Sequence, residues 1–297
     1  MTLQQLLDTW NQFFHAQSSC ATLVLFRILS GCLLLLNALL LVPLINDFFS
    51  EDGVWPTSVW SRHVRGTRLC VLNLLPPTTR AFRFLLLVHM LSVVCYLIGF
   101  QYRIATVTLF VTMTSIHHRN AYILSSGDTL LRILVFLMCF SDGAGGLSVD
   151  SWLAEKPFLA FQQTDPWPMR IMQIQVCIIY LRTVFWKLRG NMWWAGTAAW
   201  YPLWVEAYVR FRPPSWMLNK YTIAIATWGT LVEELGLCSL IWIREFRYPM
   251  IVLGVLFHLM LEIVMNLQLF SWIMIISLMI FVFPQDAESF FIYICEF

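Results

Sequence analysis

Long apolar runs, separated by polar connections, follow one another through most of this chain. A helix that crosses the hydrocarbon core of a bilayer needs about 20 predominantly apolar residues. About eight runs approach this length, near residues 21–45, 83–100, 103–117, 127–141, 169–187, 219–243, 248–265 and 267–283. The pattern predicts an all-α fold, a polytopic transmembrane helical bundle with about eight spans.

The segment before the first run has a different pattern. Its apolar side chains recur at helical spacing on one face, at Leu3, Leu6, Leu7, Trp10, Phe13 and Phe14. Polar side chains occupy the other face, which is typical of an amphipathic helix that lies in the membrane interface. We therefore expect one membrane domain over residues 1–297, with an interfacial helix in 1–20, the bundle in 21–284 and a short tail in 285–297.

Composition supports a membrane protein and excludes a soluble globular one. Hydrophobic residues make up 59% of the chain and charged residues only 12%, whereas soluble domains carry about 25% charged residues. The net charge of +2 provides no basic surface for nucleic acid, so the bilayer is the expected surrounding. The eight cysteines show no C-x-x-C spacing, and neither a disulfide framework nor a metal is expected.

The orientation in the membrane stays open from charge alone. With eight spans, more Lys and Arg residues fall on the side opposite the N-terminus than on the N-terminal side. The positive-inside rule would place that richer side in the cytoplasm. Functional cations gathered at one face would produce the same imbalance.

Ionisable residues inside apolar runs are costly, and each is a functional hypothesis by default. His258 and Glu262 are four residues apart and share a helix face. A carboxylate beside an imidazole fixes the orientation of the ring and suits proton transfer. The alternative is a structural polar pair that joins two spans.

Glu233 and Glu234 lie in the middle of the run at 219–243. Adjacent residues on a helix point in different directions, so at most one of them faces a given cavity. Structural pairing and catalysis are both open for these two carboxylates.

Lys187 ends the run at 169–187, with Trp186 beside it and Arg182 five residues earlier. Burial and neighbouring positive charge favour the neutral amine, which is a general base. The alternative is a lysine that extends to the interface, and spacing alone favours this alternative.

Two further clusters lie around the fourth run. Asp128 and Arg132, at i and i+4, are expected to form a structural ion pair within their helix. His117, His118 and Asn120 follow the third run. Because adjacent histidines on a helix diverge, hydrogen bonding to a ligand or interface anchoring is expected there instead of a metal site.

Four stretches resemble, in their order and spacing, the HTTM family, which includes vitamin K-dependent γ-glutamyl carboxylase. The stretches are 117–120 followed by 126–132, 140–142 leading to 147–150, 180–194, and 257–258 followed by 269–272. The resemblance covers about residues 15–284. The animal carboxylase continues into a large lumenal domain, so this chain resembles a short, bacterial-type homologue with the membrane catalytic module.

The resemblance implies specific chemistry. Lys187 matches the lysine that deprotonates reduced vitamin K, and His258 matches a functional histidine. A third family histidine falls on Asn120 or His118. The implied cofactors are reduced vitamin K (of menaquinol or phylloquinol type), O2 and CO2. The implied reaction couples epoxidation of the quinol to carboxylation of Glu in a peptide or small protein. Arg182, Trp186, Glu233, Glu234 and Glu262 are further quinone- or substrate-binding candidates.

The same family implies an alternative. It includes a bacterial membrane protein required to mature a secreted peptide toxin, in which carboxylation is not evident. The chain could thus serve a toxin maturation or secretion system, together with a second maturation protein. In either case the family places the active face on the periplasmic or extracytoplasmic side of a bacterial cell membrane.

Overall fold

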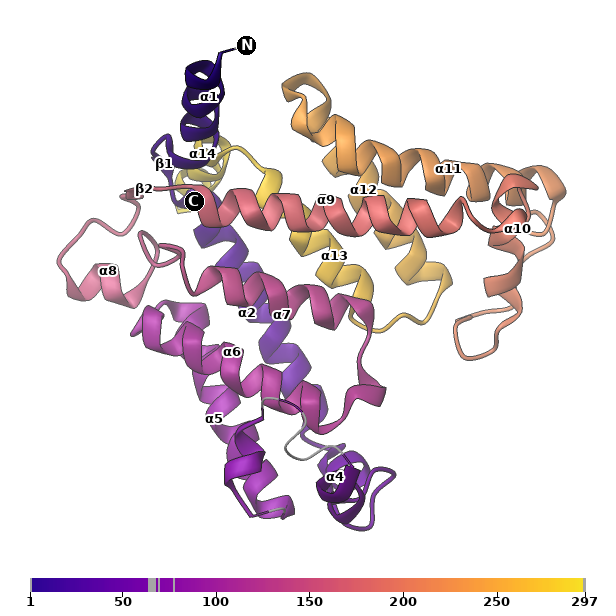
Figure 1. The fold of residues 1–297 in the computed structure, drawn as a ribbon, viewed down its shortest axis with the longest axis horizontal. Helices are drawn as coiled ribbons and strands as arrows, with labels where there is room; N and C mark the ends of the chain where they lie inside the picture. The colour runs from indigo at the N-terminus through magenta and orange to yellow at the C-terminus, as the bar shows by residue number, and fades with distance from the viewer. Residues whose placement is uncertain (1, 64–67, 69, 77, 296–297) are drawn as a thin grey trace. The chain divides into compact units, whose positions relative to one another are not determined.

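The computed structural model describes residues 2–63, 68, 70–76 and 78–295, and it consists almost entirely of helices (Figure 1). The all-α prediction is confirmed. The chain forms two compact units, one of residues 1–170 with 283–297 and one of residues 171–282. The expectation of one membrane domain over residues 1–297 stays a prediction.

The first unit contains most of the N-terminal helices. Its elements are α1 (Leu3–His15), β1 (Ser18–Ser19), α2 (Ala21–Leu41), α3 (Ile45–Phe49), α4 (Thr57–His63), η1 (Val71–Leu74), α5 (Thr79–Ile98), α6 (Tyr102–Arg119), η2 (Ala121–Ile123), α7 (Ser126–Met138), α8 (Val149–Leu153), β2 (Gln163–Thr164) and α14 (Pro284–Cys295). The two strands pair antiparallel, with Ser18 opposite Thr164.

The second unit is built around three long helices, α9, α11 and α12. Helix α9 (Trp167–Lys187) begins in the first unit and continues here. The remaining elements are α10 (Asn191–Trp194), η3 (Ala198–Trp204), α11 (Lys220–Ser239), η4 (Leu240–Trp242), α12 (Arg244–Val264), α13 (Phe270–Leu278) and η5 (Met279–Phe281).

Helices α2, α5, α6 and α7 pack together in the first unit, with α5 and α6 as neighbours in Figure 1. A buried cluster that includes aromatic side chains joins α3, α4 and α5 in this unit. Phe49 of α3 stacks on Phe82 of α5 with ring centroids 3.8 Å apart, and Trp60 of α4 belongs to the same buried cluster. The short helices after α2 are thus attached to the bundle by apolar burial.

One buried arginine inside α2 donates hydrogen bonds to backbone carbonyls. Arg27 is 1% exposed, and its guanidinium donates to the carbonyl oxygens of Gly143 (2.8 Å) and Leu147 (2.5 Å). Gly99 ends α5 in the left-handed region (φ +67°), and a Cβ there would lie 2.5 Å from Nη1 of Arg27. The close approach of Arg27 therefore requires glycine at this position.

The segment expected as a short tail forms a helix. Phe291 of α14 is buried against Cys20 and Val24 at the start of α2, and it stacks on Phe161. The side chains of Ser19 and Glu288 are also hydrogen-bonded. The C-terminal helix is thus part of the packing of the first unit.

Helix α9 packs within the second unit through side-chain contacts to neighbouring backbone. Gln173 donates to the carbonyl of Ile280 (2.7 Å), and the Cys177 thiol lies 3.8 Å from the carbonyl of Leu237. Gly236 lets α11 approach α12, since an added Cβ would lie 2.7 Å from Met250, and Gly254 lets α12 approach α13, since an added Cβ would lie 2.7 Å from Leu278. Small residues at helix contacts are typical of membrane bundles.

The structure does not confirm the expected count of about eight spans. Among the described residues, four helices are long and apolar enough to cross a membrane, namely Ala21–Leu41, Thr79–Ile98, Lys220–Trp242 and Arg244–Val264, or five if a bent helix pair near the C-terminus counts as one. Each of the other expected runs does contain a helix. However, α7 and α13 have only 13 and 9 residues, and polar side chains interrupt α6 and α9.

The first twenty residues contain the expected amphipathic helix. A capping box in which Thr2 and Gln5 exchange hydrogen bonds begins α1, and no residue of α1 is buried. Leu3, Leu7 and Trp10 are more than half exposed. An exposed apolar face suits a membrane interface, and the placement of α1 in that interface stays a prediction.

Candidate functional site

Three polar side chains of α9 lie on one face of the helix, at spacings of three, four and seven residues. They are Tyr180, Thr183 and Lys187. Tyr180 is 2% exposed, and Lys187 lies at the end of the helix with its side chain 22% exposed. The apolar run at 169–187 thus carries a polar stripe that faces other helices of the second unit.

Lys187 forms an ion pair with a carboxylate of α11. Its Nζ lies 2.5 Å from Oε1 of Glu234, whose side chain is only 9% exposed. The same ammonium lies 5.0 Å from the centre of the Trp193 ring, within cation–π distance. The structure therefore does not support an extension of Lys187 to the interface, because its head group binds a buried partner.

The Thr183 hydroxyl extends this contact. Its Oγ1 lies 3.0 Å from Oε2 of Glu234 and 2.8 Å from the carbonyl oxygen of Tyr180. The single hydroxyl proton can serve only one of these oxygens at a time. If this proton is donated to the carbonyl, the hydroxyl oxygen can accept a hydrogen bond from the protonated carboxyl of a neutral Glu234. Thr183 thus has a hydrogen bond for either protonation state of Glu234.

His258 of α12 is paired with Tyr180. The Tyr180 hydroxyl lies 3.0 Å from Nε2 of His258, which is 3% exposed. The rings of Phe257 and Phe270 lie against the imidazole. The other ring nitrogen, Nδ1, is buried and has no hydrogen-bond partner in the described part of the chain. An unsatisfied buried nitrogen is costly, and it is available to a bound hydroxyl group.

Glu233 points away from the contact between Lys187 and Glu234. Its Oε1 is buried and lacks a hydrogen-bond partner among the described residues. The two adjacent carboxylates thus have different surroundings, as neighbours on a helix must. Glu234 is the one that pairs with Lys187.

The expected orientation of His258 by Glu262 is wrong. Glu262 instead accepts from Arg210, with Nη2 and Oε1 2.5 Å apart. Arg210 is brought there by a β-bridge between Val209 and Met265, with a hydrogen bond from the Arg210 amide to the carbonyl of Val264. The four-residue spacing puts His258 and Glu262 on one face, but the cation offers the carboxylate a stronger partner.

Arg182 and Trp186 lie on the exposed side of α9, away from Lys187. The Arg182 guanidinium lies 5.7 Å from the Trp186 ring centre, and Arg189 packs on the same ring at 4.8 Å. This arrangement follows from the helical period, since residues one and five positions from Lys187 leave its face. Neither residue contacts the Lys187–Glu234 pair in the structure.

Asn120 and His118 belong to the first unit. Asn120 is 2% exposed, its Oδ1 accepts from the amide of Tyr122 (3.1 Å), and its Nδ2 donates to the carbonyl of Phe48 (3.4 Å). These bonds fix the turn after α6 and the end of α3. His118 is half-buried. Lys187 belongs to the second unit, and a role of Asn120 or His118 in quinone binding stays a prediction.

The expected ion pair between Asp128 and Arg132 is not formed. Asp128 accepts from the amide (2.7 Å) and hydroxyl (2.8 Å) of Ser125, which makes a capping box at the start of α7. Arg132 instead has its Nη1 3.5 Å from Nδ1 of His117. Unsatisfied amides at a helix N-terminus attract the carboxylate more directly than a side chain one turn later.

Two residues that contact Glu234 or His258 were not singled out from the sequence. Tyr180 and Thr183 lie seven and four residues before Lys187, and this spacing could have identified them. Arg210 could not be found in this way, because a β-bridge between distant loops positions it. Within the described residues, no group of three or more His, Cys, Asp or Glu side chains has the geometry to hold a metal ion.

Comparisons with known proteins agree with the resemblance. The sporulation-delaying protein SdpB of Bacillus subtilis (strain 168) is 33% identical over 126 residues, which are 40% of this chain and 39% of that relative. The matched part is thus less than half of the relative's length. No solved structure matches the chain. A family model described as the HTTM domain matches residues 15–286, nearly the whole chain. The protein therefore belongs to the HTTM family.

Proposed function

We propose that this protein is a membrane enzyme that resembles vitamin K-dependent γ-glutamyl carboxylase, in which Lys187 and Glu234 move a proton from a reduced quinone. The observation that carries the proposal is the 2.5 Å contact between Lys187 Nζ and the buried carboxylate of Glu234. A side chain whose proton can pass to a partner is a suitable acid–base catalyst.

The surroundings of the pair favour proton exchange within it. Two opposite charges attract strongly in an apolar interior, but each also loses hydration there. Transfer of one proton from the Lys187 ammonium to Glu234 removes both charges and leaves a neutral amine beside a neutral acid. Thr183 can accept the hydrogen bond of that acid. The amine is then the base that accepts a phenolic proton.

The residues present fit the head group of a quinol. Nδ1 of His258 is a buried, unpartnered nitrogen that can pair with a phenolic oxygen. The Trp193 ring, which lies against Lys187, offers a flat apolar surface. When bound, a reduced quinone together with O2 supplies the strong base that removes a proton from substrate Glu, so that CO2 can add. Tyr180 holds His258 through Nε2 and so orients Nδ1.

In this proposal the peptide substrate reaches Lys187 from the extracytoplasmic side of a bacterial cell membrane. Lys187, a functional cation in this proposal, belongs to the side that is richer in Lys and Arg and that the positive-inside rule would assign to the cytoplasm. Functional cations do not report topology, so this charge is compatible with an extracytoplasmic face.

A second candidate function is a membrane component of a peptide-toxin maturation or secretion system without carboxylase activity. The observation that favours it is the similarity to the sporulation-delaying protein SdpB. In that case a second protein takes part in maturation of the toxin, and the Lys187–Glu234 pair is a structural polar contact between α9 and α11.

The test is an assay of the purified full chain in lipid nanodiscs with reduced vitamin K, O2 and bicarbonate, with and without a Glu-containing peptide. The enzyme proposal predicts vitamin K epoxide, its loss in Lys187→Ala, and peptide-bound label from radioactive CO2. A well-folded protein that forms no epoxide would overturn the proposal. A toxin precursor that is processed only in cells with the intact gene would then support the second candidate.

A further inference from the structure

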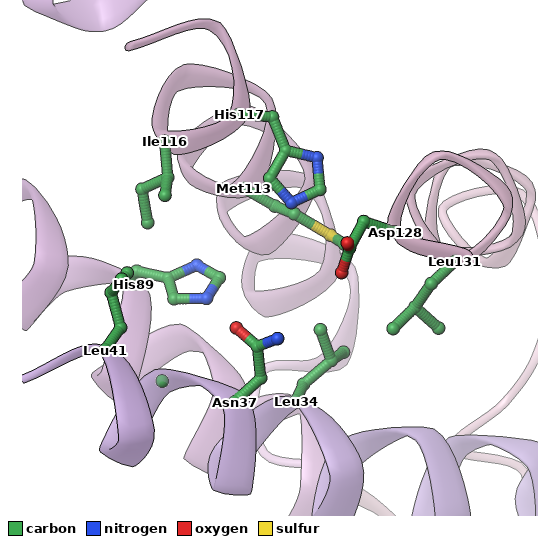
Figure 2. Close-up of a pocket in the computed structure, with 10 residues that line it drawn as sticks. Leu34, Asn37, Leu41, His89, Met113, Ile116, His117, Asp128 and Leu131 are labelled. Carbon is green, nitrogen blue, oxygen red and sulfur yellow. The ribbon is translucent and has the colours of Figure 1, made fainter. Parts of the chain in front are cut away.

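A small polar cavity lies inside the first unit, between α2, α5, α6 and α7. Asn37, His89, His117 and Asp128 line it, one from each helix, and Figure 2 shows these side chains directed toward a common space. Apolar side chains complete the wall, namely Leu34, Ala38, Leu41, Met113, Ile116 and Leu131. Four polar side chains that converge inside a membrane bundle are costly unless something satisfies them.

The four groups do not satisfy one another. Among the described residues, the Asn37 amide has no hydrogen bond, and neither do Nε2 of His89 and Nε2 of His117. Asp128 uses Oδ2 for Ser125, which leaves Oδ1 without a protein partner in the described ranges. Donors and acceptors from four helices thus face a shared space with their hydrogen-bonding capacity unused.

The other contacts of the two histidines set which nitrogen carries the proton. Arg132 can only donate, so Nδ1 of His117, 3.5 Å from it, must accept, and the ring proton lies on Nε2. The Thr112 hydroxyl lies 2.8 Å from the carbonyl of Thr108, which directs its proton there. Nδ1 of His89, 3.0 Å from Thr112, then donates, and Nε2 of His89 is an acceptor.

The cavity presents a donor at His117, acceptors at His89 and Asp128, and both kinds of group at Asn37. Its volume is about 20 Å³. A single water needs roughly 10–15 Å³ and two to four polar partners, whereas an aromatic ring does not fit this space. We propose that the cavity binds one water molecule, which joins the four helices and gives buried His89 its route of proton exchange through Asp128.

The charged groups around this water are few. Asp128 is the carboxylate at the cavity, and Arg132 stands behind His117, with Arg68 near enough to act on Arg132. No charged side chain of α2 or α5 lines the cavity within the described residues. A neutral water suits these surroundings, because it can accept from His117 and donate to His89 and Asp128, whereas an anion would be repelled by the Asp128 carboxylate.

Solid-state NMR of the full chain, ¹⁵N-labelled at histidine, in lipid bilayers tests this proposal. We expect magnetisation transfer from water to the side-chain nitrogens of His89 and His117, with the neutral-ring proton on Nδ1 of His89 and on Nε2 of His117. Exposed His15 serves as the positive control. Absence of transfer at His89 and His117, with transfer present at His15, overturns the proposal, as does a His117 proton on Nδ1.

Three variants locate the water. Asn37→Leu removes the amide and fills the cavity, so the water signal at His89 should disappear. Asn37→Ser keeps a hydroxyl and leaves room, so the signal should remain. Leu40→Ile, on the exposed side of α2, is the matched control and should behave as the unmodified protein. A signal that survives Asn37→Leu, with the fold intact, contradicts the site.

Discussion

Two buried arginines of the first unit and four polar side chains of the second unit have different kinds of partner. In the first unit, Arg119 donates to the carbonyls of Trp55 (3.1 Å) and Phe49 (3.4 Å) and to the Thr57 hydroxyl (3.1 Å). Arg27 likewise donates to two carbonyl oxygens. In the second unit, Lys187 pairs with Glu234 and Tyr180 pairs with His258, side chain to side chain.

This difference separates structural roles from chemical ones. A carbonyl oxygen cannot take up a proton at ordinary pH, so an arginine bound to carbonyls can only hold a loop in place. Two ionisable side chains in contact can exchange a proton. The comparison therefore supports the chemistry proposed for the Lys187–Glu234 pair and gives Arg119 and Arg27 a role in loop attachment.

The largest expected effect is loss of activity in Lys187→Ala. Removal of the base should lower the rate of vitamin K epoxide formation about 10²–10⁴-fold. Lys220→Ala, which changes an exposed lysine at the start of α11, is the matched control and should keep its rate. Epoxide formed by the two variants is measured by chromatography. An unchanged rate in Lys187→Ala would contradict a chemical role for Lys187.

Single substitutions in the pair should also destabilise the second unit. Lys187→Met and Glu234→Leu each leave a buried charge alone, which costs about 3–5 kcal/mol. The double variant replaces both charges with apolar side chains and should recover most of this stability. Thermal unfolding in detergent measures the three variants, and additive losses in the double variant would contradict direct pairing.

Arg119→Met tests the first unit. Loss of the guanidinium leaves three acceptors of the 49–57 segment without their donor, at a cost of about 2–3 kcal/mol. We expect a lower unfolding temperature and faster protease cleavage within residues 50–56. Loss of epoxide formation at unchanged stability would instead indicate a chemical role for Arg119 and contradict its assignment to loop attachment.

Asp128 and Arg132 should behave independently. Asp128→Ala removes a helix cap and should cost about 1 kcal/mol. A double-variant cycle with Arg132→Met should give a coupling energy within about 0.5 kcal/mol of zero, since the two side chains form no ion pair. A larger favourable coupling, measured by thermal unfolding, would restore the ion pair that the spacing predicts.

The smallest effect at neutral pH concerns Cys20, just before α2. Burial raises the pKa of its thiol from 9.0 to about 11. The thiolate is the reactive form, so Cys20 should resist maleimide at pH 7 while exposed Cys295 reacts. The neutral thiol stabilises the fold below pH 9, and this contribution is lost as pH rises toward 11. Rapid labelling of Cys20 at pH 7 would show that its site is open.

The sequence predicts the helices well because apolar runs of this length have few other solutions in a membrane. It also selects Lys187, Glu234 and His258, since ionisable groups in such runs are rare. The sequence does not predict which side chains are hydrogen-bonded to one another. His258 pairs with Tyr180 instead of Glu262, and Asp128 pairs with Ser125 instead of Arg132.

These failures have a common physical cause. Spacing along one helix shows which side chains share a face, but it does not show what another helix or loop presents to that face. Arg210 reaches Glu262 only because residues 208–210 and 264–266 meet in a β-bridge. The predicted number of spans is also not confirmed, since α7 and α13 are shorter than their apolar runs suggest.

The most direct test of the central claim is the activity of the Lys187→Met/Glu234→Leu double variant. This variant should fold, because both charges are removed together. A proton-transfer centre predicts a stable protein in lipid nanodiscs that forms no vitamin K epoxide under conditions in which the unmodified protein does. A stable double variant that forms epoxide at the unmodified rate would contradict the account and leave the Lys187–Glu234 pair with a structural role alone.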